Sequence, residues 1–152
     1  MNIVLRKADI KDAKKIQSMI AGYAKKDAML SRSLIEIYEN IRDYFIVSKG
    51  SKILGCCALH VCWEDLAEIK ALAVDEKEAK KGIGRKLVNA ALKEAKALKA
   101  KKVFCLTYVP KFFRKFGFKN ISRKKLPHKI WTECLKCHKF PNCDEQAMML
   151  RL

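Results

Sequence analysis

The feature that most constrains the fold is an apolar run followed by a glycine turn and an amphipathic stretch. Residues 67–74 are largely apolar and predict a buried strand, and Gly82 and Gly84 lie shortly after it. The stretch 85–99 then predicts a helix, because apolar side chains recur on one face at Leu87, Val88, Ala91, Leu92, Ala95 and Leu98. A strand, a turn and a helix in this order are typical of mixed α/β domains.

The rest of the chain supplies further elements of both kinds. Alternating or apolar runs predict strands at 2–7, 44–48, 53–63, 103–109 and 147–152, with another from Phe118 onward. Helical spacing predicts helices at 10–24, 33–42 and 111–116, the first of them capped by Asp9 with Asp12 three residues on. We therefore expect one mixed α/β domain over residues 1–152.

The charge is strongly positive, with 33 Lys+Arg against 16 Asp+Glu and a net charge of +17. Nucleic acid is one explanation, but the lysines are spread along the chain and are not interleaved with aromatic residues. We favour a solvated Lys-rich surface with a site for an anionic small molecule, and no nucleic-acid partner. No apolar run reaches the length of a membrane span, and the first residues lack the apolar core of a signal peptide, so we expect a cytoplasmic protein without membrane contact.

The glycine turn is the first candidate binding site. Glycines let the backbone approach a ligand closely, and the first N–H groups of a helix have no intrahelical partners. Lys80, Lys81 and Arg85 add positive charge, so the segment predicts a phosphate or pyrophosphate site, with a simple tight turn as the alternative. The segment is neither a Walker loop, which needs Gly-Lys-Ser/Thr, nor a dinucleotide fingerprint, which needs a third glycine.

The stretch Leu72-Ala73-Val74 through Gly82-Ile83-Gly84 resembles the acetyl-coenzyme-A loop of the GNAT superfamily of N-acetyltransferases. Two positions depart from the family pattern: Ala79 stands where Arg or Gln is expected, and Lys80 stands where Gly is common. The resemblance implies a central mixed, twisted sheet of about six to seven strands flanked by about four helices. It also implies acetyl-CoA as co-substrate, held by Leu72, Ala73, Val74, Ala79, Lys80, Lys81, Gly82, Ile83, Gly84 and Arg85.

A second family element begins at Phe113. The run Phe113-Arg114-Lys115-Phe116-Gly117-Phe118 resembles the aromatic-x-x-x-Gly-Phe element of these enzymes. Phe113 lies where many members carry a tyrosine that acts as general acid, and a phenyl ring cannot donate a proton. That role is therefore empty in this chain or filled by another group.

A narrower resemblance covers most of the remaining chain. Segments 29–33, 42–44, 126–131 and 134–148 are similar to short, bacterial-type N-acetylglutamate synthases. This implies an amino-acid N-acetyltransferase that acts on the α-amine of L-glutamate, the first step of arginine biosynthesis. The alternatives are acetylation of another amine (a different amino acid, a protein N-terminus or a lysine) and a non-catalytic basic module that binds CoA.

Acetyl transfer to an amino acid needs a general base, because the free amine arrives as an ammonium. Glu68 matches the acidic residue that similar enzymes use, although it could instead pair with Lys70 as an ordinary strand carboxylate. A backbone N–H of residues 72–74 would stabilise the oxyanion if the strand bulges there. Tyr108 is the candidate proton donor to the leaving thiolate, with a solvent-exposed hydroxyl as the alternative.

Glutamate carries two carboxylates, which require positively charged partners. Arg32 matches the position that holds the substrate carboxylate in similar enzymes, and a surface helix charge is the alternative. Lys129 beside Trp131 and, more weakly, Lys70 are further candidates. The predicted acceptor site thus comprises Leu30, Arg32, Lys70, Lys129 and Trp131.

The seven cysteines fall into two groups. Cys56, Cys57, Cys62 and Cys105 lie in apolar runs and are expected in the core. Cys134, Cys137 and Cys143 lie in a polar stretch and could bind zinc with His138, but we do not favour this because the adjacent Cys137 and His138 would strain to reach one ion. A Cys134–Cys143 or Cys137–Cys143 disulfide, or reduced thiols in an acceptor-side loop, remain alternatives, as does a zinc-dependent nucleic-acid module. Domains of this kind often form homodimers, although no residue here sets the oligomeric state.

Overall fold

The structure is a computed structural model that describes residues 2–26, 29, 31–126 and 145–152. Seven strands form one sheet in the order β1-β2-β3-β4-β5-β7-β6. All neighbours are antiparallel except β4 and β5, which run parallel. The strands are β1 (Ile3–Lys7), β2 (Tyr44–Lys49), β3 (Lys52–Trp63), β4 (Leu66–Val74), β5 (Lys102–Thr107), β6 (Lys119–Asn120) and β7 (Gln146–Arg151). The helices are α1 (Ala13–Lys25), α2 (Leu34–Glu39), α3 (Ile83–Ala97) and α4 (Pro110–Arg114), with the 3₁₀ turns η1 (Ile10–Asp12), η2 (Ile41–Asp43), η3 (Glu76–Glu78) and η4 (Arg123–Lys125).

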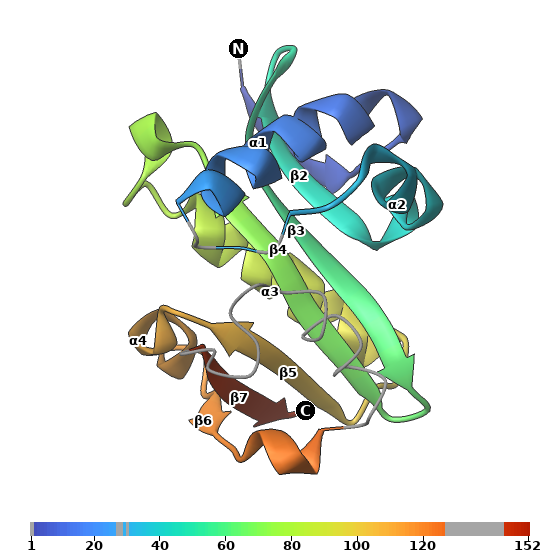
Figure 1. The fold of residues 1–152 in the computed structure, drawn as a ribbon, viewed down its shortest axis with the longest axis vertical. Helices are drawn as coiled ribbons and strands as arrows, with labels where there is room; N and C mark the ends of the chain where they lie inside the picture. Colours follow the sequence, from blue (N-terminus) through green and yellow to red (C-terminus); the bar gives the residue numbers. More distant parts are fainter. Residues whose placement is uncertain (1, 27–28, 30, 127–144) are drawn as a thin grey trace.

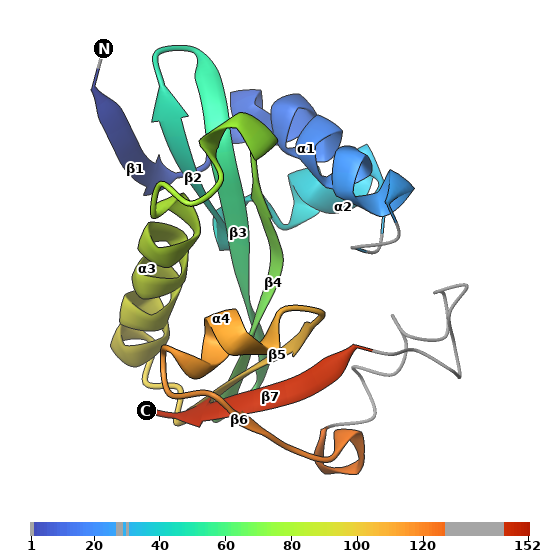
Figure 2. The same cartoon turned by 90° about the vertical axis from the view of Figure 1, so that its left-hand side faces the viewer.

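The helices lie on both faces of the sheet. Figures 1 and 2 show α1 and α2 across one face of β2, β3 and β4, and α3 along the opposite face. This arrangement confirms the predicted mixed sheet flanked by helices. In the part of the chain that the structure describes, no helix is long and apolar enough to cross a membrane.

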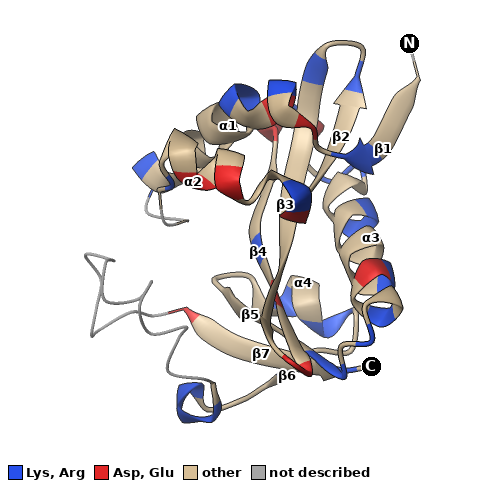
Figure 3. Cartoon of the chain, turned by 90° about the vertical axis from the view of Figure 1, so that its right-hand side faces the viewer, with Lys and Arg blue, Asp and Glu red and all other residues tan. Residues whose placement is uncertain are grey.

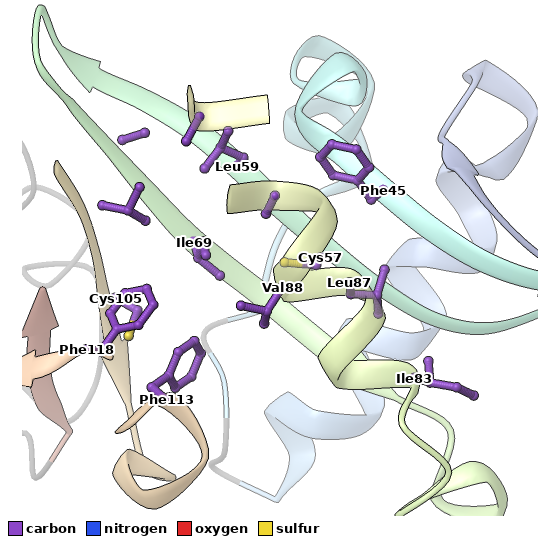
Figure 4. Packing of buried hydrophobic residues seen from close by; sticks show 14 of the residues in the cluster. Phe45, Cys57, Leu59, Ile69, Ile83, Leu87, Val88, Cys105, Phe113 and Phe118 are labelled. Atoms are coloured by element: carbon purple, nitrogen blue, oxygen red, sulfur yellow. The ribbon is translucent and has the colours of Figure 1, made fainter. Parts of the chain in front are cut away.

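α3 packs against the sheet through the apolar stripe that its sequence predicts. The buried positions of this helix are Ile83, Leu87, Val88, Ala91 and Ala95. The helix approaches β3 most closely at Gly55, where an added Cβ would lie 2.9 Å from Ile83 Cγ2 and 3.1 Å from Leu87 Cδ1. Figure 4 shows this layer continuing into Phe113, Phe118 and Cys105, so the helix, α4 and β5 share one core.

Several predicted boundaries shift for local reasons. The helix expected at 33–42 ends at Glu39, because Asn40 donates its side-chain N–H to the Glu36 carbonyl at 2.9 Å and turns the chain into η2. The strand expected to reach 109 ends at Thr107, whose hydroxyl accepts the Val109 N–H at 2.9 Å. The helix expected from Ile10 begins as the turn η1, and the strand expected from Phe118 is only the two residues of β6.

Asp12 fixes the entry from β1 into α1. Its buried carboxylate accepts two hydrogen bonds from Arg6, at 2.8 and 3.0 Å, and a third from the Asp9 N–H at 2.8 Å. Burial by itself would raise the pKa of Asp12, but these hydrogen bonds outweigh burial and the pKa lies below its ordinary value. The ionised carboxylate therefore stabilises the folded state at neutral pH.

We expect Asp12→Asn to lower the free energy of unfolding at pH 7 by about 1–3 kcal/mol, measured by urea denaturation. The pKa of the Asp12 carboxyl is lower in the folded state than in the unfolded state. The difference in the free energy of unfolding between wild type and variant should therefore be complete above the unfolded-state pKa, and it should shrink as the pH falls through the folded-state pKa. Asp65→Asn is the matched control, since its half-exposed carboxylate pairs with Lys102 at 3.5 Å and should contribute less than about 1 kcal/mol. If the difference in the free energy of unfolding between wild type and Asp12→Asn grew as the pH falls, this account of Asp12 would be contradicted.

Candidate active site

The two central strands separate at their carboxyl ends. Residues 66–68 of β4 pair with residues 102–104 of β5. Beyond these three pairs the two strands diverge (Figures 1 and 2). Past Glu68, the edge of β4 that faces β5 has no strand partner among the described residues. Ligands of open α/β sheets bind where neighbouring strands part in this way, so this edge is the candidate site.

β4 bulges at the start of its open segment. Cys56 pairs with Ala73 and Ala58 with Lys70, so two residues of β4, Ala71 and Leu72, face one residue of β3. Ala71 has φ +55°, a left-handed conformation that costs a non-glycine residue about 1–3 kcal/mol. The Cys56 thiol donates to the Ala71 carbonyl at 3.4 Å. An oxyanion donor on this strand is expected only if the strand bulges, and a bulge is present at Ala71 and Leu72.

Tyr23 of α1 engages the open edge just beyond the bulge. Its hydroxyl donates to the Val74 carbonyl at 2.6 Å and accepts from the Val74 N–H at 3.1 Å. The next N–H, that of Asp75, donates to Leu54 of β3 at 2.8 Å, so the polar groups of Val74 point away from β3. The sequence analysis did not select Tyr23, although its spacing of seven from Ile16 and three from Ile20 places it on the sheet-facing stripe of the helix.

This geometry narrows the oxyanion donors expected at residues 72–74. The Val74 N–H donates to the Tyr23 hydroxyl, which makes it a weaker candidate for the oxyanion donor. Ala73 lies in register with Cys56 and alternates with Val74, which directs its N–H toward β3. Leu72, at the bulge, is the remaining candidate.

The glycine turn has the geometry of an anion site. Lys80 and Gly82 have φ of +65° and +82°, and Gly82 is the N-cap of α3 without a side-chain hydrogen bond. The first turn of α3 carries no acidic residue. Its leading N–H groups, together with the exposed Lys80 and Arg85, therefore make this end of the helix electropositive. The left-handed φ of Lys80 also explains why glycine is common at this position in similar proteins.

Neighbouring elements hold this turn against the end of β4. An added Cβ at Gly84 would lie 3.4 Å from the Phe112 ring of α4 and 3.8 Å from Val74 Cγ2. Ala79 has an ordinary extended conformation, and Lys81 pairs with Glu78 at 3.0 Å. The open edge of β4 thus leads directly to the N-terminus of α3.

Two predicted site residues lie on the α1/α2 side of β4. Glu68 is in register with His60 and Lys70 with Ala58, which packs in the core under α1 and α2. Because cross-strand partners share a face, Glu68 and Lys70 point to the same side. Glu68 is only 7% exposed, and Lys70 is half-buried. The strand therefore brings the predicted base and one predicted substrate cation together.

Arg32 lies on this same side, immediately before α2. Its side chain is 6% exposed and its guanidinium contacts the Glu36 carboxylate at 3.2 Å. Burial raises the pKa of Tyr44 at the start of β2, and the nearby Arg32 charge acts in the opposite direction. The alternative of a solvated surface charge does not describe this buried side chain.

The aromatic candidates separate into two environments. Tyr108 directly follows β5 and continues the alternation of Phe104 and Leu106, which pack on the side of the sheet that carries Glu68. Phe113 is buried on the opposite side, with its ring edge-to-face against Phe112 and Phe118 at 5.2 and 5.3 Å between centroids. Phe113 is thus a core residue without a proton to give.

The buried cysteines offer no nucleophile. Burial raises the pKa of Cys56 to about 12, and it raises those of Cys57 and Cys105 as well. These three are protonated at neutral pH and, as expected, lie in the core, while Cys62 is half-buried. Such thiols favour direct attack by an amine over transfer through a cysteine.

Some predicted residues cannot be placed. Leu30, Lys129 and Trp131, together with Cys134, Cys137 and Cys143, lie outside the described residues. Within the described ranges, no group of three His, Cys, Asp or Glu side chains is arranged to hold a metal ion. Zinc binding, which the sequence does not favour, therefore stays one of the alternatives for these cysteines.

The positive charge is not gathered at this site alone. Figure 3 shows Lys and Arg on both the α1 side and the α3 side of the sheet. This spread in space follows from the distribution of lysines along the whole sequence.

The sequence matches the model of the acetyltransferase (GNAT) family over residues 11–118. An uncharacterized N-acetyltransferase from Chlorobaculum tepidum is 40% identical over 148 residues, which make up 97% of this chain and 96% of that protein. An amino-acid acetyltransferase from Mycobacterium tuberculosis is 32% identical over 138 residues, or 89% of this chain and 79% of that protein.

Solved structures share the fold. A Mycobacterium tuberculosis protein in complex with CoA and NLQ has a TM-score of 0.85 at 30% identity, covering 98% of this chain and 99% of that one. N-acetylglutamate synthase from Neisseria gonorrhoeae, complexed with coenzyme A and N-acetyl-glutamate, has a TM-score of 0.90 at 22% identity and is covered over 35% of its length. The second likeness concerns the fold alone. Together with the family match, these findings show that the chain belongs to the GNAT family of acetyltransferases.

Proposed function

We propose that this protein transfers the acetyl group of acetyl-CoA to the α-amine of an amino acid, with L-glutamate as the acceptor. The observation that carries the proposal is the placement of buried Glu68 and buried Arg32 on one side of the sheet, beside the open edge of β4. A buried carboxylate suits proton abstraction, and a buried guanidinium suits binding of a substrate carboxylate. The named activity of the Mycobacterium tuberculosis relative supports the same assignment.

Acetyl-CoA would bind along the open edge of β4 and the glycine turn, which together lead from the bulge to the N-terminus of α3. The pyrophosphate would accept hydrogen bonds from the N–H groups in the first turn of α3, with Lys80 and Arg85 nearby. The amide-containing arm would lie along the open edge of β4 and use the polar groups of Val74. This places the thioester near the bulge at Ala71 and Leu72.

The reaction is then a direct displacement. Glu68 removes a proton from the ammonium, and the neutral amine attacks the thioester carbonyl to form the new C–N bond. The Leu72 N–H stabilises the oxyanion, a contribution of typically about 10²-fold or more in rate. Collapse breaks the C–S bond, and the thiolate leaves with a proton from Tyr108 or from water. The attacking nitrogen loses its second proton at this stage, and that proton replaces the one given to the thiolate.

The acceptor's carboxylates provide the specificity. Arg32 would bind one of them, and Lys70, on the same side of the sheet, would attract the other. Lys129 and Trp131 remain proposed members of this acceptor site. An acceptor with one carboxylate would make only one of these two contacts and should therefore bind more weakly.

The test is a thiol-release assay with acetyl-CoA against the twenty amino acids and spermidine under reducing conditions. Turnover led by L-glutamate supports the proposal. Turnover led by another amine would retain the acetyltransferase but overturn the acceptor assignment. Binding of CoA without turnover on any amine would point to a non-catalytic module.

The Tyr23 hydroxyl occupies both polar groups of Val74 that the bound CoA arm would use. We therefore expect Tyr23→Phe to tighten CoA binding by about 2- to 10-fold, measured by calorimetry, because one competing hydrogen-bond partner is removed. Tyr38→Phe, on the exposed side of α2, should leave the affinity unchanged. Weaker binding by Tyr23→Phe would instead mean that the hydroxyl holds the strand end in its binding shape.

A further inference from the structure

A histidine lies directly across the sheet from the proposed base. His60 of β3 is in register with Glu68 of β4, which puts their Cβ atoms about 4.5–5.5 Å apart on one face. The Nδ1 atom of His60 lies 2.6 Å from a carboxylate oxygen of Asp43, at the end of η2. Asp43 lies in the segment 42–44 that resembles N-acetylglutamate synthases, whereas His60 lies outside the motifs that identified the site.

The carboxylate sets the tautomer of this histidine. An ionised aspartate can only accept hydrogen bonds, so Nδ1 of His60 carries the proton and donates it to Asp43. In the neutral ring, Nε2 is then left with a lone pair that can accept a second proton.

Exposure distinguishes His60 from Glu68. Glu68 is 7% exposed, whereas the side chains of His60 and Asp43 are 38% and 24% exposed. A buried base must lose the proton that it takes from each substrate before the next turnover. The partly exposed imidazole lies opposite the buried carboxylate on the neighbouring strand, and an imidazole nitrogen can both take up and release a proton.

Other described charged groups on this side fit the task less well. Arg32 and Lys70 carry side chains that are protonated in their usual state and have no site for a further proton. Glu36 is engaged by Arg32 at 3.2 Å. His60 combines register with Glu68, a fixed orientation and contact with solvent.

We propose that His60, oriented by Asp43, carries the proton from Glu68 to solvent, an inference that rests on the proposed role of Glu68 as base. In the first step the ammonium N–H breaks and a Glu68 O–H forms. In the second, this O–H breaks, directly or through one water, and Nε2–H forms while Glu68 returns to its carboxylate. The imidazolium then releases its proton to water. His60 acts through Glu68 and is a positioning and relay residue that does not touch the substrate.

The test is chemical rescue of His60→Ala. We expect kcat with acetyl-CoA and L-glutamate to fall by about 10- to 100-fold while both KM values stay within about twofold of wild type. Added imidazole should restore turnover, and a series of methylimidazoles should rescue in proportion to their basicity, which a purely structural role would not produce. Cys62→Ala, two residues along β3, is the control and should change nothing.

A second variant keeps the test decisive if His60→Ala folds poorly. His60→Gln retains volume and a donor for Asp43 but cannot carry a proton, so it should show the same loss of kcat. An unchanged kcat in either variant, or a loss in folded protein that no imidazole relieves, would overturn the relay. A wild-type protein that acetylates no amine would overturn the proposed function as well, whereas an active wild type with an unaffected His60 variant overturns only the relay.

Discussion

Replacing Glu68 by glutamine is expected to lower kcat for amino-acid acetylation by about 10²- to 10⁴-fold while CoA binding is unchanged. The amide has nearly the same shape as the carboxylate but cannot accept the proton of the ammonium. Glu68 is buried on the α1/α2 side of β4, away from the glycine turn that would hold the CoA phosphates. The loss should therefore appear in the chemical step and not in CoA affinity.

The measurement pairs steady-state kinetics with calorimetric titration of CoA. Glu64→Gln is the matched control, because Glu64 is exposed in the turn between β3 and β4 and should behave as wild type. If Glu68→Gln retains kcat within about twofold of wild type, Glu68 is not the base.

Arg32→Ala is expected to raise the KM for L-glutamate by about 10- to 100-fold, because a hydrogen bond to a charged group contributes about 1.5–3 kcal/mol. The KM for acetyl-CoA should be nearly unchanged, since Arg32 precedes α2 and the proposed CoA site follows β4. Arg32→Lys should recover only part of the loss, as an ammonium cannot form the paired contact of a guanidinium.

Arg42→Ala provides the control for Arg32. Arg42 is exposed in η2, a short distance further along the chain, and should not alter either KM. Equal effects of Arg32→Ala on both substrates would remove this residue from the acceptor site. Circular dichroism on each variant separates these outcomes from unfolding.

The features that sequence predicted best depend on long, regular patterns. α3 buries the apolar face that its spacing indicates, and its first turn follows Gly82, whose positive φ requires a residue such as glycine. The strands before and after this helix, β4 and β5, are also indicated by their apolar runs. These features are local, so a single sequence carries enough information to place them.

The features that sequence did not reveal depend on register and on distant contacts. The bulge at Ala71 places an alanine at positive φ, where the residue type gives no warning. Tyr23 and Val74 are 51 residues apart, and their hydrogen bonds arise only when α1 packs on the sheet. His60 faces Glu68 because β3 and β4 pair with a register that two irregularities shift.

The most direct measurement of the central claim is NMR of a reaction between ¹³C-acetyl-CoA and L-glutamate with the wild-type protein. The account predicts that the labelled carbonyl leaves the thioester and appears in the α-amide of N-acetylglutamate at the rate at which free CoA thiol is released. Thiol release without acetylated glutamate, or no release at all, would contradict it.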